Sequence, residues 1–490
     1  MPGVFDRLLR RVLLRGLPPE TIAACIAHPE VRALLRFRFV YLFAFHAPVL
    51  VPLLEALSGR GDPALSVLSL GIASLAMVLA DVPTGLYADR AGPKAALRLG
   101  LLLTTLTLFL FFVLGVVRAL VLRDLDARAT WLPGVVGVLV LEAVIGVSLA
   151  LLSGADTVLF LRVAQRSGIP GLERRGFEGV GSAIRYLGTM FAVGAGAALF
   201  DLIGALIHNE ARRAALQSGL FLLTCLAQLV ALRDLGRIAD VPPAPGSRAR
   251  PGLREVARAL VEAARFRVFF RAMWLLCMAA AAALFAVYLF QSPLSRLTRE
   301  LAQREPLAWP LYTLVAMGGY WACARGSHAA RLHHHDTTDV ALWPSARWQT
   351  ALSLFLLVLY PLLFALVHTA RPAVQAGVLL AAAAIVCLLF NFARGFNEPY
   401  SATALIAFTE RHGHAVPASV ISGFNSLKRG AHFLLSMVFF LAQRGPSSIR
   451  GLRIDARLAL TLSVLALCFA LALVPAVRRP RLPGLDDAPR

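Results

Sequence analysis

The chain has 490 residues and a formal net charge of +21, and 58% of its residues are hydrophobic while 16% are charged. Soluble domains have about 45–50% apolar and about 25% charged residues, so this composition excludes an ordinary soluble protein. In a soluble chain so basic a charge would indicate a nucleic-acid partner. Here the Arg residues lie mainly between long apolar blocks, which predicts contact with a lipid bilayer and no nucleic-acid partner.

The N-terminal segment, residues 1–35, contains a basic amphipathic stretch at 4–15. Apolar side chains fall on one helical face of that stretch and Arg side chains on the other. Such a helix is suited to an anionic membrane surface. Docking of the same helix on the rest of the protein is the alternative, and the sequence does not choose between them.

Apolar blocks of about 20 residues recur along the rest of the chain, the length that a helix needs to cross roughly 30 Å of hydrocarbon. Twelve such blocks predict an all-α polytopic membrane protein with twelve transmembrane helices. The blocks lie at 36–57, 64–86, 95–117, 132–155, 179–203, 215–232, 268–290, 307–324, 348–367, 373–396, 417–442 and 456–477.

The longest connection, 233–267, divides the twelve blocks into two sets of six. Its stretch 242–252 is rich in Pro and Gly and reads as an irregular linker, and a basic helix is predicted after it. Two six-helix bundles around a central loop are the layout of transporters built from parallel repeats, which bind substrate near the midplane. The predicted segments are 1–35 (N-terminal), 36–232 (first bundle), 233–267 (linker), 268–477 (second bundle) and 478–490 (tail).

The distribution of basic residues predicts the orientation of the chain. The connections that share a side with the two termini carry most of the Lys and Arg residues. Because cytoplasmic loops carry an excess of Lys and Arg, both termini are expected in the cytoplasm.

A polar motif follows the second block, in a short connection. Its Asp89 carboxylate ends a predicted helix, where it can meet the N-terminus of another helix or an Arg of the opposite half. A contact of this kind that forms in only one conformation biases an equilibrium between conformations. We therefore assign a gating role to Asp89 and to its motif neighbours Arg90 and Lys94.

This motif resembles the signature loop of the major facilitator superfamily, G-x-x-x-D-R-x-G-R-K, with Pro93 in place of the second Arg. The D-V-P-T-G that starts at Asp81, S-G-A-D at 153–156 and P-A-S-V-I-S at 417–422 resemble segments of bacterial drug- and metabolite-efflux-like members. Pro417 stands where those members have Arg, which leaves the role of that Arg without a counterpart. The resemblance implies a monomeric secondary transporter of the bacterial inner (plasma) membrane that needs no cofactor. It also implies a central cavity lined by the first, fourth, seventh and tenth spans. On the same resemblance, the gating role extends to the other motif residues Asp81, Gly85 and Gly92.

Several ionisable residues fall inside the predicted spans, where charges are costly and by default functional. Asp156 in the fourth block and Arg185 in the fifth can pair if these helices are antiparallel neighbours. In the second half Glu398 can likewise meet Lys428 or Arg429. Such a pair either forms a structural bridge that satisfies two buried charges, or contains a group that changes its partner when a proton or a charged substrate arrives. Both interpretations stay open.

Glu142 lies near the middle of the fourth block without an obvious partner. Burial disfavours a charged carboxylate, so Glu142 is expected to be protonated much of the time. With His46 of the first block, the resemblance makes it the best candidate for a proton or cation site. A neutral core residue remains the alternative role of His46.

The leading functional hypothesis is secondary transport of a small solute, with proton-coupled efflux of an amphipathic or cationic compound as its most specific form. A membrane-embedded acyl or lipid-phosphate transferase is an alternative, for which the loop 333–336 (HHHD) is the candidate cluster. A transport-inactive receptor or lipid-handling relative is another. Neither that loop nor the six dispersed Cys residues has the spacing of a metal site, so no metal is predicted.

Overall fold

The structure is a computed structural model of the chain, and it describes its residues in stretches. These are 6–7, 17–58, 63–120, 127–169, 174–240, 252–266, 269–282, 284–285, 311–332, 373–412 and 417–444, with single positions at 347, 350, 351, 355 and 359.

The fold is all-α, and most of the described helices are long. The helices in chain order are α2 (Pro19–Ala27), α3 (Pro29–Val40), η2 (Ala47–Val49), α4 (Leu50–Ser58), α5 (Pro63–Ala91), α6 (Pro93–Leu120), α7 (Ala127–Leu152), α8 (Ala155–Ser167), α9 (Arg174–Leu206), α10 (Glu210–Gly236), α11 (Leu253–Arg265), α13 (Leu311–Leu332), α15 (Ala373–Arg411) and α16 (Pro417–Arg444). A further apolar helix covers Phe269–Ala282.

Five helical segments in the described part of the chain are long and apolar enough to cross a membrane. They coincide with the second to sixth predicted blocks and are Ser66–Ala91, Pro93–Leu120, Gly134–Ser167, Glu178–Leu206 and Ala211–Gly236. The seventh, eighth, tenth and eleventh blocks coincide with Phe269–Ala282, α13, α15 and α16. The twelfth block, the HHHD loop and most of the ninth block and of the 4–15 stretch lie outside the described residues.

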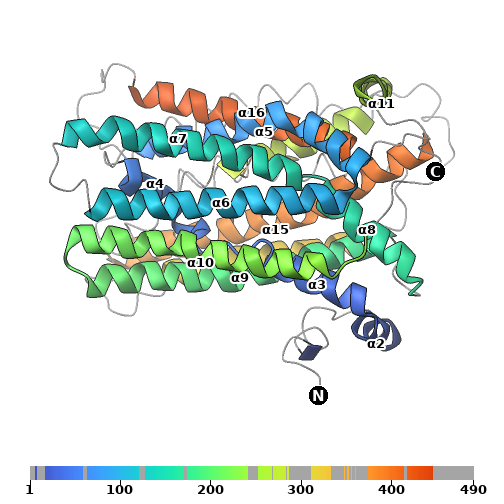
Figure 1. Ribbon diagram of the computed structural model, residues 1–490, viewed down its shortest axis with the longest axis horizontal. Coiled ribbons are helices and arrows are strands. Elements are labelled where there is room, and N and C mark those ends of the chain that lie inside the picture. The colour runs from blue at the N-terminus through green and yellow to red at the C-terminus, as the bar shows by residue number, and fades with distance from the viewer. Residues whose placement is uncertain are drawn as a thin grey trace.

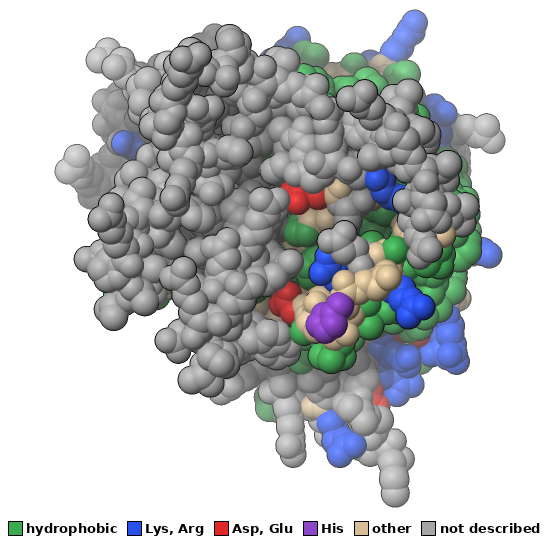
Figure 2. All heavy atoms as spheres, turned by 90° about the vertical axis from the view of Figure 1, so that its left-hand side faces the viewer, with side chains coloured by type: hydrophobic (Ala, Val, Ile, Leu, Met, Phe, Trp, Pro, Cys, Tyr) green, Lys and Arg blue, Asp and Glu red, His purple; other side chains and the backbone are tan. Residues whose placement is uncertain are grey.

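The long helices run side by side along the longest axis of the molecule, as Figure 1 shows. Helices α2 and α11 lie across that axis at one end, which we call the α2/α11 end, where the α5–α6 turn and α8 also lie. Figure 2 shows the opposite end: charged and polar side chains gather near the centre of its described part, and hydrophobic side chains cover much of the rest. The described flanks expose large apolar side chains, Leu79, Leu106, Val140 and Leu229 among them, as a lipid-facing surface does.

The first predicted block, 36–57, is not a single helix, which corrects the expectation of one continuous span. Helix α3 ends at Val40, and the chain turns before η2 and α4 begin. Pro48 lies within η2. Because Pro lacks an N–H and disfavours helical backbone at the residue before it, an uninterrupted helix is unfavourable here. The break exposes backbone groups to the protein interior, and the Phe45 N–H donates to Thr224 Oγ1 (3.1 Å).

The fourth block is also interrupted, at its C-terminal end. Gly154 has a φ of 74°, a left-handed backbone conformation that residues with a side chain rarely adopt. This glycine separates α7 from α8. Asp156 consequently lies in the first turn of α8. A glycine with positive φ also forms the α5–α6 turn: Gly92 has a φ of 95°, and Pro93 begins α6.

The two halves of the chain meet along two helix pairs, α5 with α16 and α9 with α13. Gly85 permits the close approach of α5 to α16, because a Cβ built on it would lie 2.8 Å from Ser419 Cα. A buried cluster joins side chains of both halves, with Val49 and Phe221 from the first and Phe285 and Tyr312 from the second. These contacts place the residues of α5, α8 and α9 directly against those of α15 and α16.

Candidate functional site

A cavity of about 410 Å³ lies between the two halves. All four spans that the resemblance assigns to the cavity contribute, with His46, Glu142, Cys277 and Glu398 as examples. The fifth and eleventh spans line it as well. The charged side chains that line it are Glu142, Asp156, Glu178, Arg185, Arg394, Glu398, Lys428 and Arg429.

A buried Arg of the first span organises one side of the cavity. Arg38 is 0% exposed and Glu178 is 2% exposed. Both Arg38 Nη atoms donate to the Glu178 carboxylate (3.3 and 3.1 Å), and Nη2 also donates to the Asp156 carbonyl oxygen (3.0 Å). Arg38 Nη1 lies 3.5 Å from Asp156 Oδ2. Tyr41 donates to the same Asp156 oxygen (2.7 Å), so Asp156 is fixed from two directions.

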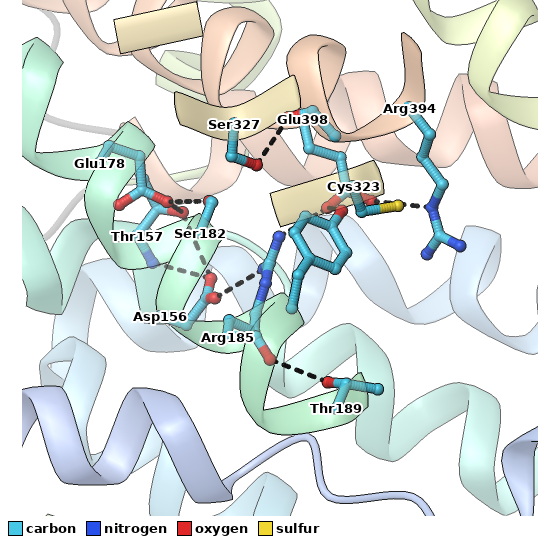
Figure 3. A network of polar contacts seen from close by, with 12 residues as sticks. Asp156, Thr157, Glu178, Ser182, Arg185, Thr189, Cys323, Ser327, Arg394 and Glu398 are labelled. Carbon is cyan, nitrogen blue, oxygen red and sulfur yellow. Dashed lines mark hydrogen bonds and ion pairs between the residues drawn. The ribbon is translucent and has the colours of Figure 1, made fainter. Parts of the chain in front are cut away.

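Arg185 of α9 extends this arrangement across the interface between the halves. Its Nη1 lies 3.5 Å from Asp156 Oδ2, and its Nη2 donates to Glu398 Oε2 at 2.6 Å. The Tyr186 hydroxyl donates to the same oxygen of Glu398, and Arg394 Nε lies 3.7 Å from Glu398 Oε1. Figure 3 shows these residues converging from α8, α9 and α15.

Carboxylates and guanidinium groups therefore alternate in an unbroken series, which we call the charge network. Its members are Glu178, Arg38, Asp156, Arg185, Glu398 and Arg394. Each buried charge contacts at least one charge of opposite sign, as the cost of burying isolated charges requires. Among the described residues, the ion pair of this network that links the two halves is the one between Arg185 and Glu398.

The predicted pair of Asp156 and Arg185 is therefore present. The predicted pairing of Glu398 with Lys428 or Arg429 is found only in part: Lys428 interacts electrostatically with Glu398, but the described ion pairs of Glu398 are with Arg185 of the other half and Arg394 of its own helix. Lys428 and Arg429 lie in the wall of the same cavity. Sequence spacing does not give the rotation of α15 about its axis, and that rotation decides which neighbour the carboxylate reaches.

The other two candidates, Glu142 and His46, line the cavity on the side of the first half. Glu142 is 3% exposed and makes no hydrogen bond or ion pair with the described residues. His46 is part of the protein interior: its Nδ1 lies 3.0 Å from Thr224 Oγ1, and its ring stacks on Phe221 with centroids 5.0 Å apart. The described residues contain no group of three or more His, Cys, Asp or Glu side chains suited to a metal ion.

The gating motif makes its main contact at the α2/α11 end. Asp89 accepts hydrogen bonds from the backbone N–H of Ala418 (3.2 Å) and of Ser419 (3.0 Å) and from the Ser419 hydroxyl (2.6 Å). These donors belong to the first turn of α16, so the carboxylate of one half caps a helix of the other. Lys94 pairs with Asp240 at 3.2 Å.

Neighbouring polar contacts strengthen the same junction. Asp81 accepts from Ser426 (3.2 Å), and Asn425 donates to Ser153 Oγ (2.8 Å). Ser422 donates to the Ser153 carbonyl oxygen (3.2 Å). The three segments that carry the family resemblance, around Asp81, Ser153 and 417–422, therefore meet at one place in the fold.

Replacing Asp89 with Asn is expected to loosen this junction without unfolding the protein. The amide keeps the shape but loses the charge that favours a helix N-terminus, an effect of about 0.3–2 kcal/mol. Solute flux at matched expression should fall, because the conformation closed at this end becomes less populated. Glu20→Gln is the control, since Glu20 is an exposed carboxylate of α2 at the same end. Equal flux in the two variants would show that the motif is only a turn.

Sequence reasoning missed Arg38, Glu178 and Arg394 as members of the network. Arg38 and Arg394 lie inside predicted apolar blocks, so the signal that identified Arg185 was also available for them. Glu178 lies one residue before the fifth block and gave no such signal.

The arrangement of the chain is similar to that of several solved membrane transporters. A D-xylose–proton symporter matches with a TM-score of 0.59 at 13% identity, covering 92% of this chain and all (100%) of that one. The xylose transporter XylE from E. coli, in a partially occluded inward-open conformation, matches with 0.56 at 13% identity, covering 94% and 99%. A variant of the nucleoside transporter NupG matches with 0.54 at 14% identity, covering 91% and 99%.

No protein-family model matches the sequence, and no curated protein does. The structural likeness, over more than nine-tenths of the chain, carries the assignment of the fold. It implies twelve helices in two bundles, in agreement with the twelve apolar blocks. The chain is an integral multi-pass membrane protein with the fold of the major facilitator superfamily.

Proposed function

We propose that this protein is a secondary transporter, which carries a small polar solute through the cavity between its halves by alternating access. The contact between Arg185 and Glu398 is the observation that carries the proposal. It crosses from one half to the other in the wall of the cavity. If the halves rock about a central site, this contact must change, and a solute or proton that competes for either group biases the movement.

The two ends of the interface support the same proposal. At the α2/α11 end the halves are joined by hydrogen bonds from α16 to Asp89 and Ser153. Hydrogen bonds can break and re-form in each cycle at small net cost, because water replaces the lost partner. A junction of this kind suits a gate better than a continuous apolar core would.

Proton coupling is the second part of the proposal, with Glu142 as the coupling residue. A carboxylate in the cavity wall without a described partner can take up a proton at little cost and lose it when water or solute reaches it. The xylose–proton symporters of similar structure offer a precedent for proton coupling on this fold, and the nucleoside transporter one for a polar solute.

A cationic solute, the expectation from sequence, would meet charges of both signs, because Glu142, Asp156, Glu178 and Glu398 line the cavity beside the cations. Four Lys and Arg side chains line it: Arg185, Arg394, Lys428 and Arg429. A solute whose only charge is positive would meet repulsion from this side. The geometry favours neither uptake nor efflux, so the proposal covers both directions.

Flux measurements on purified protein in liposomes test the proposal. The vesicles are offered neutral sugars and nucleosides, organic acids, and organic amines, with and without a pH gradient. We expect one class to accumulate only in vesicles that contain the protein, and Arg185→Gln to abolish that accumulation. Folded protein that moves none of these classes under any gradient would contradict the proposal and favour a receptor or enzyme.

We also propose that both termini and the α2/α11 end face the cytoplasm, on the basis of the distribution of Lys and Arg residues. Reporter fusions at Pro243 and His334 should then read as cytoplasmic, and a fusion at Ala127 as external. An external reading at Pro243 would overturn this orientation.

A further inference from the structure

One of the four cations in the cavity wall differs from the others. Arg185 and Arg394 both contact Glu398. Arg429 has an interaction partner of its own. Lys428 lines the cavity but makes no hydrogen bond or ion pair with any residue that the structure describes. An ammonium group away from water needs hydrogen-bond acceptors, so this side chain has three donors available for a ligand.

The carboxylates of the cavity do not supply the missing partner. Glu178 and Asp156 are held by Arg38, and Asp156 also contacts Arg185. Glu398 attracts the Lys428 ammonium group electrostatically, but Arg394 and Arg429 repel it. In the part of the second half that the structure describes, the cavity wall therefore carries three cationic side chains and a single carboxylate, Glu398.

A second group in the same wall also lacks a partner. Asn397 is 4% exposed, lines the cavity beside Glu398, and its Oδ1 accepts no hydrogen bond in the described structure. Buried polar atoms are nearly always hydrogen-bonded in native proteins. An amide oxygen without a described partner and an ammonium group without one, both in the wall of the same cavity, point to a polar ligand there.

We propose that the solute carried in this cavity is an organic anion and that its negatively charged group binds to Lys428. Asn397 supplies an uncharged polar contact to the same solute. In the conformation described, Arg185 and Arg394 are engaged with Glu398, so Lys428 is the side chain that selects the charge of the arriving solute. This rests on the proposed function, because it names the class of solute that the transporter carries.

The charge preference of the cavity can be measured without knowing the solute. A reporter thiol is introduced as Ser401→Cys, in the cavity wall one turn beyond Glu398. The intact chain is treated with an anionic reagent, 2-sulfonatoethyl methanethiosulfonate, and with its cationic counterpart, 2-(trimethylammonium)ethyl methanethiosulfonate. Peptide mass spectrometry follows the reporter separately from the six native cysteines. The measured quantity is the ratio of the two rates, relative to the ratio for free cysteine.

We expect the relative ratio to favour the anionic reagent at least threefold, and Lys428→Gln to remove that preference. Arg265→Gln is the matched control: it removes the same charge from an exposed side chain of α11 and should leave the ratio unchanged. A ratio at or below that of free cysteine, or one that Lys428→Gln leaves unaltered, would overturn the proposal. So would reaction with uncharged methyl methanethiosulfonate alone, because the cavity would then exclude charged solutes.

These outcomes are distinct from a failure of the proposed function. If the cavity prefers the anionic reagent but the liposomes move no solute, the anion site stands and transport does not. If transport is found and the preference is absent, the solute is not an anion. If no reagent reaches the reporter, the cavity is closed to solutes, and both proposals fail.

Discussion

Replacing Arg38 with Gln should lower the stability of the purified protein by about 3–5 kcal/mol, the usual cost of removing one partner from a buried ion pair. Arg38 is fully buried and is the cation in contact with Glu178, which is itself 2% exposed. Without the guanidinium, Glu178 keeps a buried charge with no counter-ion within ion-pair distance in the described structure, and Asp156 keeps only Arg185. Unfolding in mixed micelles with increasing SDS measures the loss.

Arg36→Gln is the matched control for this prediction. It lies two residues earlier on α3, and its side chain is 40% exposed where it pairs with Asp234, which is 1% exposed. Asp234 keeps a second partner, Arg237 at 3.4 Å, when Arg36 is replaced, so the control should lose clearly less stability than Arg38→Gln. If Arg36→Gln and Arg38→Gln destabilised the protein equally, the charge network would not be the structural centre of the first half.

Replacing Glu142 with Gln should abolish solute accumulation driven by a pH gradient and leave exchange of solute across the membrane measurable. The amide is close in shape to a protonated carboxyl group but cannot release a proton, so the cavity still forms and coupling is lost. We expect gradient-driven accumulation in liposomes to fall at least tenfold, while exchange at equal pH stays within a factor of three.

The control for this second prediction is Glu55→Gln, which changes another buried carboxylate of the first half that does not line the cavity. It should leave the ratio of accumulation to exchange unchanged. Persistent proton-driven accumulation in Glu142→Gln would remove Glu142 as the coupling residue and shift that role to Glu398 or Asp156.

The sequence predicts the all-α membrane fold well because insertion into a bilayer depends on the hydrophobicity of each segment, which can be read directly from its residues. Apolar blocks of the length of a bilayer appear in any hydropathy pattern, and the five spans from Ser66 to Gly236 follow the predicted blocks closely. The breaks at Pro48 and Gly154 were not predicted, because an apolar composition continues through both. Backbone conformation at these points depends on tertiary contacts, such as that between Phe45 and Thr224.

The candidate site was predicted in part. The pair of Asp156 and Arg185 could be predicted because both lie inside apolar blocks at similar depth on neighbouring helices. The contact of Arg185 with Glu398 could not, since it depends on how two halves with no sequence connection at that point pack together. Arg38 lies near the start of the first predicted block, and its burial is visible only in the folded chain.

The central claim is that the halves must separate at the α2/α11 end in each transport cycle. A disulfide between Ser153→Cys and Asn425→Cys tests it, because these residues belong to opposite halves and are in contact, with Asn425 Nδ2 2.8 Å from Ser153 Oγ. The control pair, Thr104→Cys and Ser148→Cys, is 3.0 Å apart within the first half. Solute flux is measured in liposomes after oxidation and again after reduction. We expect oxidation to stop flux in the 153–425 variant, reduction to restore it, and the control pair to be unaffected. Full flux through the oxidised 153–425 variant would contradict the separation of the halves at this end.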